Sequence, residues 1–168
     1  MITDTDTSPL LLQVSGISFS PEGEEVAISY CSPDFLTAAT WELPTSGHIF
    51  SLRDPTRCLA QLGSESCVTS LQYSRQVNLL AGGCYSGQVS CWDLRTSSRS
   101  LISSSAPLSS AHTEPVHCLV WTSSKTGTEV MTTSEDGFVK WWDVRKLEVP
   151  TSQWQLQDMD KSGQVLSG

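Results

Sequence analysis

The sequence predicts an all-β protein, a partial β-propeller of about three four-stranded blades. Three observations support this fold class. Short apolar runs rich in β-branched and aromatic residues recur between Gly, Ser and Asp, which is typical of strands and turns. The runs repeat with a period of roughly 50 residues, close to the length of one propeller blade. Signals for helices are nearly absent along the chain.

One apolar segment opens each of the three units. Each copy begins with Val, continues with an aliphatic residue three positions on, and reaches an aromatic residue two positions further. The copies are "VSGISF" (Val14–Phe19), "VTSLQY" (Val68–Tyr73) and "VHCLVW" (Val116–Trp121). We interpret them as the first strand of each blade.

Two further series complete the units. "EEVAISY", "NLLAGG" and "TEVMTT" follow the three opening segments and predict the second strands. "GQVSCWDLR" (Gly87–Arg95) and "GFVKWWDVR" (Gly137–Arg145) predict the third strands, and "GHIFSLR" (Gly47–Arg53) is a weaker copy without the Trp-Asp pair. The serine-rich stretch from Thr96 to Ser110 is predicted to hold a short outer strand flanked by surface loops.

The adjacent tryptophans of the last unit have a structural interpretation. Strand alternation places Lys140 and Trp142 on one face and Trp141 on the other. Neighbouring blades cover both faces of a propeller blade, so both tryptophans can be buried. Trp142 also matches Trp92 of the preceding unit. The repetition favours blade architecture over a platform for a substrate.

The segments "CWDLR" and "WWDVR" resemble the ends of WD repeats. The resemblance implies a buried, hydrogen-bonded tetrad in each complete blade: a His before the first strand, a Ser or Thr in the second, an Asp in the following turn, and the Trp. The last unit supplies all four as His112, Thr132, Asp136 and Trp142. In the middle unit Gly82 and Ser86 stand beside Trp92 at the Thr and Asp positions, and the first unit lacks the pattern. These residues are expected to be structural and not catalytic.

A longer stretch, Asn78 to Pro150, is similar to the propeller of axonemal dynein intermediate chains, of the intermediate chain 2 type. The segments G-G-C-Y-x-G-Q and W-x-x-S-K-T-G-T-E carry this resemblance more specifically than Trp-Asp does. The similarity is weaker over Val14 to Tyr73. The resemblance implies a non-catalytic scaffold of an axonemal dynein arm, supporting microtubule-based motility, with a dynein heavy chain and a second intermediate chain as partners.

The same resemblance implies a place in the cytoplasm, on the cytoskeleton of a cilium or flagellum axoneme. ATP hydrolysis belongs to the heavy chain, so no enzymatic activity and no cofactor are expected. Two alternatives stay open: a generic intracellular WD-repeat adaptor, for example one that presents substrates to a ubiquitin ligase, and a truncated isoform that does not assemble. A calcium-regulated or hydrolytic protein is a third, weaker alternative.

Composition and charge argue against several classes of function. The net charge is −8 with only ten Lys and Arg among 168 residues, which disfavours binding to nucleic acid. No apolar run of about 18 residues predicts a membrane span. The acidic start of the sequence lacks the pattern of a signal peptide, so we expect an intracellular protein whose six cysteines are reduced and packed as small hydrophobes.

Motifs for catalysis or metal binding are weak. Lys125 in "SSKTGTE" lacks the glycine frame of a nucleotide loop and is expected in an exposed turn. The stretch Asp158 to Gly168 begins like a calcium loop but lacks the twelfth-position Glu. His117 and Cys118 do not have the paired spacing of a zinc site. With no nucleophile elbow either, we expect no catalytic, cofactor-binding or metal site.

The predicted organisation is a disordered tail at residues 1–12, the partial propeller at 13–157 and a polar tail at 158–168. The propeller of the resembling family has more blades than this chain supplies, and three blades cannot close a ring. Two apolar blade faces are therefore expected to lie uncovered, one on the side of the last unit that carries Trp141 or Trp142. We expect self-association through these open faces, a partner that completes the ring, or partial unfolding.

Overall fold

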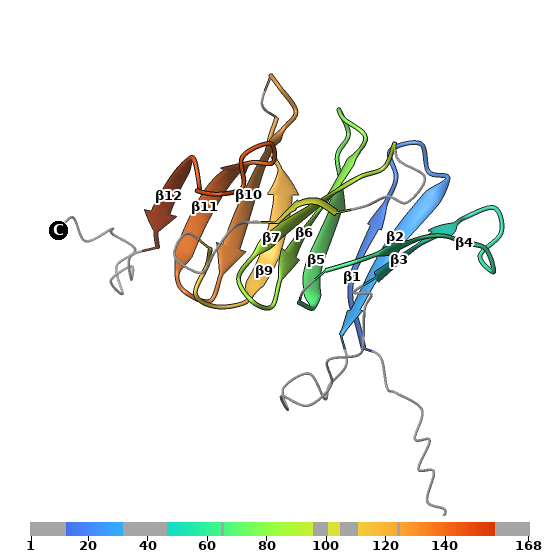
Figure 1. Ribbon diagram of the computed structural model, residues 1–168, viewed down its shortest axis with the longest axis horizontal. Coiled ribbons are helices and arrows are strands. Elements are labelled where there is room, and N and C mark those ends of the chain that lie inside the picture. Colours follow the sequence, from blue (N-terminus) through green and yellow to red (C-terminus); the bar gives the residue numbers. More distant parts are fainter. Residues whose placement is uncertain are drawn as a thin grey trace, which may run out of the picture.

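The computed structural model describes residues 13–31, 47–64, 66–95, 101–104, 111–123 and 125–156, with only the backbone described at 101–104. Within these ranges twelve strands form three four-stranded antiparallel sheets, and no residue is helical. No described segment is thus a helix long and apolar enough to cross a membrane. The sheets stand side by side in chain order (Figure 1), which confirms the predicted all-β partial propeller.

Each sheet is one blade whose four strands follow one another in sequence. Blade 1 contains β1 (Gln13–Phe19), β2 (Glu25–Cys31), β3 (Gly47–Ser51) and β4 (Cys58–Leu62). Blade 2 contains β5 (Val68–Tyr73), β6 (Leu79–Cys84), β7 (Val89–Asp93) and β8 (Leu101–Ser104). Blade 3 contains β9 (Val116–Trp121), β10 (Glu129–Ser134), β11 (Phe138–Asp143) and β12 (Ser152–Gln155).

The predicted strands are all present, and two opening strands, β5 and β9, have the predicted bounds. Strand β8 lies inside the serine-rich stretch as expected. The sequence did not single out β4 and β12, because edge strands are short and carry little apolar alternation; all four residues of β12 are exposed. The two predicted tails and the rest of the serine-rich stretch lie outside the described residues, and the domain boundaries stay predictions.

Neighbouring blades are joined by hydrogen bonds that repeat from one interface to the next. The hydroxyl of Ser15 on β1 donates to the carbonyl of Val68 at 2.5 Å, and the hydroxyl of Thr69 on β5 donates to the carbonyl of Val116. Ser15 and Thr69 occupy equivalent positions of their blades. The same side-chain-to-backbone hydrogen bond therefore joins the first strand of each blade to the first strand of the next blade at both interfaces.

Two apolar cores fill the spaces between the blades. The core between blades 1 and 2 contains Ile49, Leu71, Leu80 and Trp92, and the core between blades 2 and 3 contains Val89, Leu119, Val130 and Trp142. Each core draws on side chains from two sheets, so no blade buries its apolar residues alone. The stability of each blade therefore depends on its neighbour.

The face of blade 1 that turns away from blade 2 is apolar. Cross-strand pairing places Ile17 beside Ile28 and Phe19 beside Val26 on this face. Ile17 and Phe19 are 56% and 58% exposed. No blade among the described residues covers this face.

The outer face of blade 3 is also apolar. Met131 pairs with Trp141, Val139 pairs with Trp154, and the two indole rings meet edge to face with centroids 5.2 Å apart. Trp142 is fully buried against blade 2, whereas Trp141 is half-buried and Trp154 is 68% exposed. Of the two tryptophans that the sequence would allow to be buried, only Trp142 has a described blade covering its face.

Candidate functional site

The structure brings the four predicted tetrad residues together on the side of blade 3 that faces blade 2. The indole Nε1–H of Trp142 donates to Thr132 Oγ1 at 2.8 Å. Thr132 Oγ1 lies 2.8 Å from His112 Nε2, and His112 Nδ1 lies 2.9 Å from Asp136 Oδ2. These hydrogen bonds all form when His112 is a neutral imidazole. Its proton is then on Nδ1, which donates to Asp136, and its Nε2 accepts the hydroxyl of Thr132.

The local sequence positions each member of the tetrad. Thr132 lies on β10 and Trp142 on the adjacent β11, and both side chains face blade 2. His112 precedes β9. Asp136 lies in the β10–β11 turn, where its carboxylate also accepts the backbone N–H groups of Thr113 at 3.1 Å and Phe138 at 2.9 Å. The Asp136 carboxylate therefore links the segment before β9 to the β10–β11 turn by hydrogen bonds.

Burial sets the protonation states of the tetrad. It lowers the pKa of His112, although the adjacent Asp136 carboxylate opposes the shift, and the Lys140 charge lowers it further. Burial raises the pKa of Asp136, but the hydrogen bonds from Phe138, His112 and Thr113 outweigh it, so the pKa lies below its ordinary value. A neutral His112 beside an ionised Asp136 agrees with the hydrogen-bond pattern.

The lowered pKa values of His112 and Asp136 make the folded protein less stable in acid. Folded His112 stays neutral where the unfolded chain takes up a proton, below about pH 6.5, so the unfolded state binds more protons and stability falls as the pH drops. Asp136, with its lowered pKa, adds a further loss below about pH 4. We expect the thermal midpoint to fall between pH 7 and pH 5. The fall should persist in His117→Gln, which alters an exposed histidine, and shrink in His112→Gln; equal behaviour of the two variants would contradict it.

Lys140 is a buried residue at this site whose role the sequence did not reveal. Its Nζ donates to the carbonyl of Ala111 at 2.7 Å and lies 6.0 Å from the centre of the Trp142 ring. Burial lowers the pKa of Lys140, and Asp136 partly offsets that shift. Strand alternation in the sequence already placed Lys140 on the same face as Trp142, which was the available signal for its burial. A lysine on a strand is more often solvent-exposed, so the sequence alone did not reveal this role.

The middle blade holds its tryptophan by a different contact. Trp92 is fully buried, and its Nε1–H donates to the backbone carbonyl of Gly63 at 2.9 Å. Gly82 occupies the position of Thr132, and a Cβ at Gly82 would lie 2.9 Å from the Trp92 ring and 2.8 Å from Val68 Cγ1. The ring fills the space that a threonine side chain takes in blade 3.

Restoring the threonine in the middle blade is therefore expected to destabilise the protein. Gly82→Thr should lower the free energy of unfolding by about 1–3 kcal/mol, since overpacking forces the ring or the backbone to move. Denaturant unfolding measures the change. Gly63→Ala is the matched control, because a Cβ there meets nothing within 4 Å, and we expect a change of about 0.5 kcal/mol or less. A Gly82→Thr variant as stable as the control would contradict this account.

The Trp-Asp-x-Arg ends of blades 2 and 3 form the same clamp. Asp143 accepts the backbone N–H of Arg145 at 3.0 Å and pairs with the guanidinium at 2.6 Å, and Asp93 does the same with Arg95 at 2.9 Å and 2.5 Å. Hydrogen bonds from Arg95 lower the pKa of Asp93 to about 2. The repeat explains why the sequence keeps Asp and Arg two positions apart after each tryptophan: the pair closes the turn that leaves the third strand.

In blade 1 the strand positions of Thr132 and Trp142 are taken by Ile28 and Phe50, as judged from the cross-strand pairs. They face the open side of the blade. Blade 1 thus has no counterpart of the tetrad, in line with its weaker sequence pattern.

The remaining candidates lie apart from the tetrad. His117 Nε2 contacts Glu135 Oε1 at 2.8 Å on the surface, and Lys125 is exposed in the β9–β10 turn. In the described ranges no three His, Cys, Asp or Glu side chains gather as metal ligands would, and whether the protein binds metal stays a prediction. The calcium-loop-like stretch from Asp158 lies outside the described residues. Cys58 and Cys118 are exposed, so the expectation that all six cysteines pack as small hydrophobes is wrong for these two.

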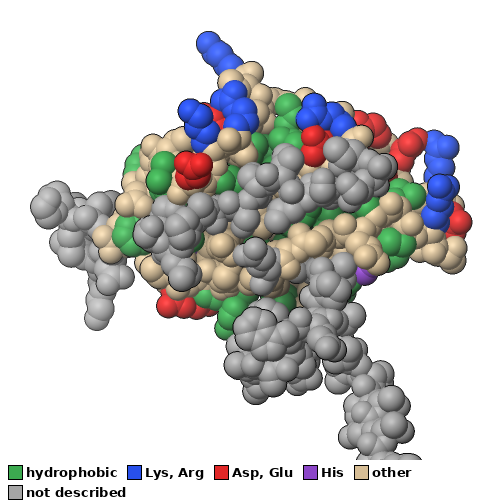
Figure 2. Space-filling model, in the orientation of Figure 1, with side chains coloured by type: hydrophobic (Ala, Val, Ile, Leu, Met, Phe, Trp, Pro, Cys, Tyr) green, Lys and Arg blue, Asp and Glu red, His purple; other side chains and the backbone are tan. Residues whose placement is uncertain are grey.

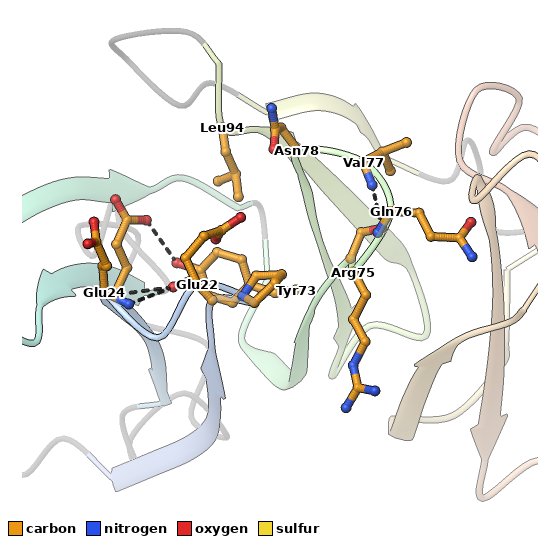
Figure 3. A pocket seen from close by; sticks show the side chains of 12 residues that line it. Glu22, Glu24, Tyr73, Arg75, Gln76, Val77, Asn78 and Leu94 are labelled. Carbon is orange, nitrogen blue, oxygen red and sulfur yellow. Dashed lines mark hydrogen bonds between the residues drawn. The ribbon is translucent and has the colours of Figure 1, made fainter.

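A groove of about 430 Å³ lies between the β1–β2 turn of blade 1 and the β5–β6 turn of blade 2 (Figure 3). Glu22 and Glu24 approach it from blade 1, and Arg75 and Gln76 lie on the blade 2 side. Its described lining contains no histidine and no cysteine. Lys and Arg side chains gather along one edge of the molecule beside acidic ones (Figure 2), and this view shows no purely basic face.

Comparison with known proteins agrees with the fold. The WD40 family (WD domain, G-beta repeat) matches residues 56–93 and 100–143. Sqt1 from Chaetomium thermophilum superposes with a TM-score of 0.66 at 20% identity, over 84% of this chain and 34% of that one. A chain of the mitotic checkpoint complex gives 0.64 at 19% identity, over 85% and 37%. The chain contains WD repeats and has the fold of a β-propeller segment.

Its sequence is similar to that of axonemal dynein intermediate chains of the intermediate chain 2 type. It is 36% identical to human dynein axonemal intermediate chain 2 over 137 residues, which cover 80% of this chain and 22% of the relative. It is 34% identical to ciliary dynein intermediate chain 3 of Heliocidaris crassispina, over 95% and 26%. The flagellar outer arm 70 kDa intermediate chain of Chlamydomonas reinhardtii is 26% identical, over 95% and 28%. The chain therefore spans about a quarter of the length of these relatives.

Proposed function

We propose that this chain is a non-catalytic scaffold of an axonemal dynein arm, where its blades dock onto a dynein heavy chain beside a second intermediate chain. The observation that carries the proposal is the 36% identity to human dynein axonemal intermediate chain 2 over 80% of the chain. Relatives from Heliocidaris crassispina and Chlamydomonas reinhardtii bear ciliary and flagellar names. The proposed location is accordingly the cytoskeleton of a cilium or flagellum.

The described residues support a scaffold more than an enzyme. His112 and Asp136, the pair that could serve a catalytic triad, are hydrogen-bonded within the tetrad, and His112 is 1% exposed. Thr132, the hydroxyl next to His112, also accepts the indole N–H of Trp142 and is fully buried. These groups stabilise a blade, and their polar atoms are hydrogen-bonded to one another. We propose a protein that works through its surfaces and needs no cofactor.

Axoneme co-sedimentation tests the proposal. The tagged full chain, expressed in ciliated cells, should sediment with demembranated axonemes, be released with the dynein arms by high salt, and co-purify with a dynein heavy chain. Trp142→Ala, which should unfold blade 3, is expected to lose both properties.

Two results would replace the proposal. Recovery with ubiquitin-ligase subunits, equal in ciliated and non-ciliated cells, would favour the generic WD-repeat adaptor. A folded chain that stays in the soluble fraction without a heavy chain would favour a truncated form that does not assemble.

A further inference from the structure

Two thiols from different blades meet where β2 ends and β5 begins. Cys31 is the last residue of β2, and Cys67 directly precedes β5. β2 packs against β5 across the interface between blades 1 and 2, which places Cys67 as the hydrogen-bond partner of the Cys31 thiol. The pair lies beside the repeated inter-blade contact, where Ser15 Oγ donates to the Val68 carbonyl at 2.5 Å and lies 3.0 Å from Ser29 Oγ.

The two cysteines differ in accessibility. Cys31 is half-buried, so a small reagent can reach it, whereas Cys67 is 7% exposed. The backbone of Cys67 is held in place, because its carbonyl accepts the N–H of Tyr85 at 2.8 Å. This arrangement provides an accessible thiol with a second, fixed thiol next to it, which is the arrangement of an oxidant-sensitive pair.

The electrostatic environment separates Cys31 from its buried neighbours. The hydrogen bond from Cys67 lowers the pKa of Cys31 to about 7, burial acts in the opposite direction, and Ser15 adds a smaller lowering. Burial instead raises the pKa of Cys84 and raises that of Cys91 to about 12. The lowered pKa of Cys31 favours its thiolate, the form that reacts with oxidants.

We propose that Cys31 and Cys67 are a redox-responsive thiol pair, which hydrogen peroxide converts into a disulfide between blade 1 and blade 2. The Cys31 thiolate attacks one peroxide oxygen, the O–O bond breaks, and the departing hydroxide takes up a proton to become water. Cys31 is then a sulfenic acid. Cys67 attacks its sulfur, the S–O bond breaks, and a second water leaves as the S–S bond forms. Two thiols and one peroxide give one disulfide and two waters, and an added dithiol reverses the reaction.

The bridge has a structural consequence at the contact it spans. Blade 1 is held to blade 2 by the apolar core and by hydrogen bonds such as the one from Ser15. A covalent link between the end of β2 and the residue before β5 closes the intervening chain into a loop and restricts the unfolded state, so the oxidised protein should melt at a higher temperature.

Mass spectrometry of the full chain tests the proposal. The protein, purified in reductant and freed of it, is treated with an equimolar amount of hydrogen peroxide, and the remaining thiols are alkylated before digestion. We expect a linked peptide that joins Cys31 to Cys67, with a mass lower by two hydrogen atoms than the two separate peptides. In Cys67→Ser, a sulfenic acid at Cys31 should be trapped by dimedone, and in Cys31→Ser the link should be absent.

Controls separate this pair from general thiol oxidation. Cys58→Ser changes an exposed cysteine of blade 1 and should leave the Cys31–Cys67 link intact, together with the rise in thermal midpoint and its reversal by dithiothreitol. The rate of alkylation of Cys31 by iodoacetamide should rise with a midpoint near pH 7, below the pH 8.5 of an ordinary thiol. Oxidation that joins only Cys58 or Cys118 between chains, or an alkylation midpoint of Cys31 near pH 8.5, would overturn the proposal.

Discussion

Replacing Trp142 by alanine is expected to lower the free energy of unfolding by about 3–5 kcal/mol, as other truncations of large buried side chains do. The ring is fully buried between blades 2 and 3 and packs with Val130 and Leu119. Its removal also leaves Thr132 without the indole donor and uncovers the Nζ of Lys140. A loss of this size is a large fraction of the stability of an ordinary domain.

Two further variants separate the causes of that loss. Trp154→Ala removes the same side chain from a surface strand where it is 68% exposed, and we expect at most a small change in the thermal midpoint. Trp142→Phe keeps most of the apolar area but lacks the N–H, so it should cost about 1–3 kcal/mol because the buried Thr132 oxygen loses its indole donor. Thermal and denaturant unfolding measure all three variants. Unchanged melting of Trp142→Ala would contradict the structural role proposed for the tetrad.

The purified 168-residue chain is expected to associate at micromolar concentration. The outer face of blade 1 exposes Ile17 and Phe19, and the outer face of blade 3 exposes Trp154 beside Trp141. Faces of this kind are covered by a neighbouring blade at the two interfaces inside the molecule, and uncovered apolar area drives association. The net charge of −8 favours solubility but covers no apolar surface.

Light scattering and analytical ultracentrifugation measure the association. We expect a mass above that of one chain and strong binding of a hydrophobic dye. The double variant Phe19→Glu and Trp154→Glu places a charge on each face and should reduce both signals, while Ser123→Glu, at an exposed turn, should not. A compact wild-type monomer that melts cooperatively and excludes the dye would refute open blade faces.

The sequence by itself determined the repeat, the β class and the four tetrad positions that the structure brings together. Strand signals depend on local alternation and on turn residues, and both are written in consecutive positions such as "GFVKWWDV". The resemblance to WD repeats then marked Asp136 and also His112, which lies far from Trp142 in the chain. The sequence did not predict the outer strands β4 and β12, because they carry little alternation of apolar and polar residues.

Only the tertiary structure decided which groups meet across blades. The burial of Lys140, the contact of Trp92 with the Gly63 carbonyl and the pairing of Cys31 with Cys67 each join residues from separate segments. The two tryptophans of β11 show the physical reason. They are neighbours with equal local propensity, yet Trp142 is fully buried and Trp141 half-buried. Burial depends on which sheet lies opposite each face, and that arrangement is set by the packing of whole blades and not by the residues next to each tryptophan.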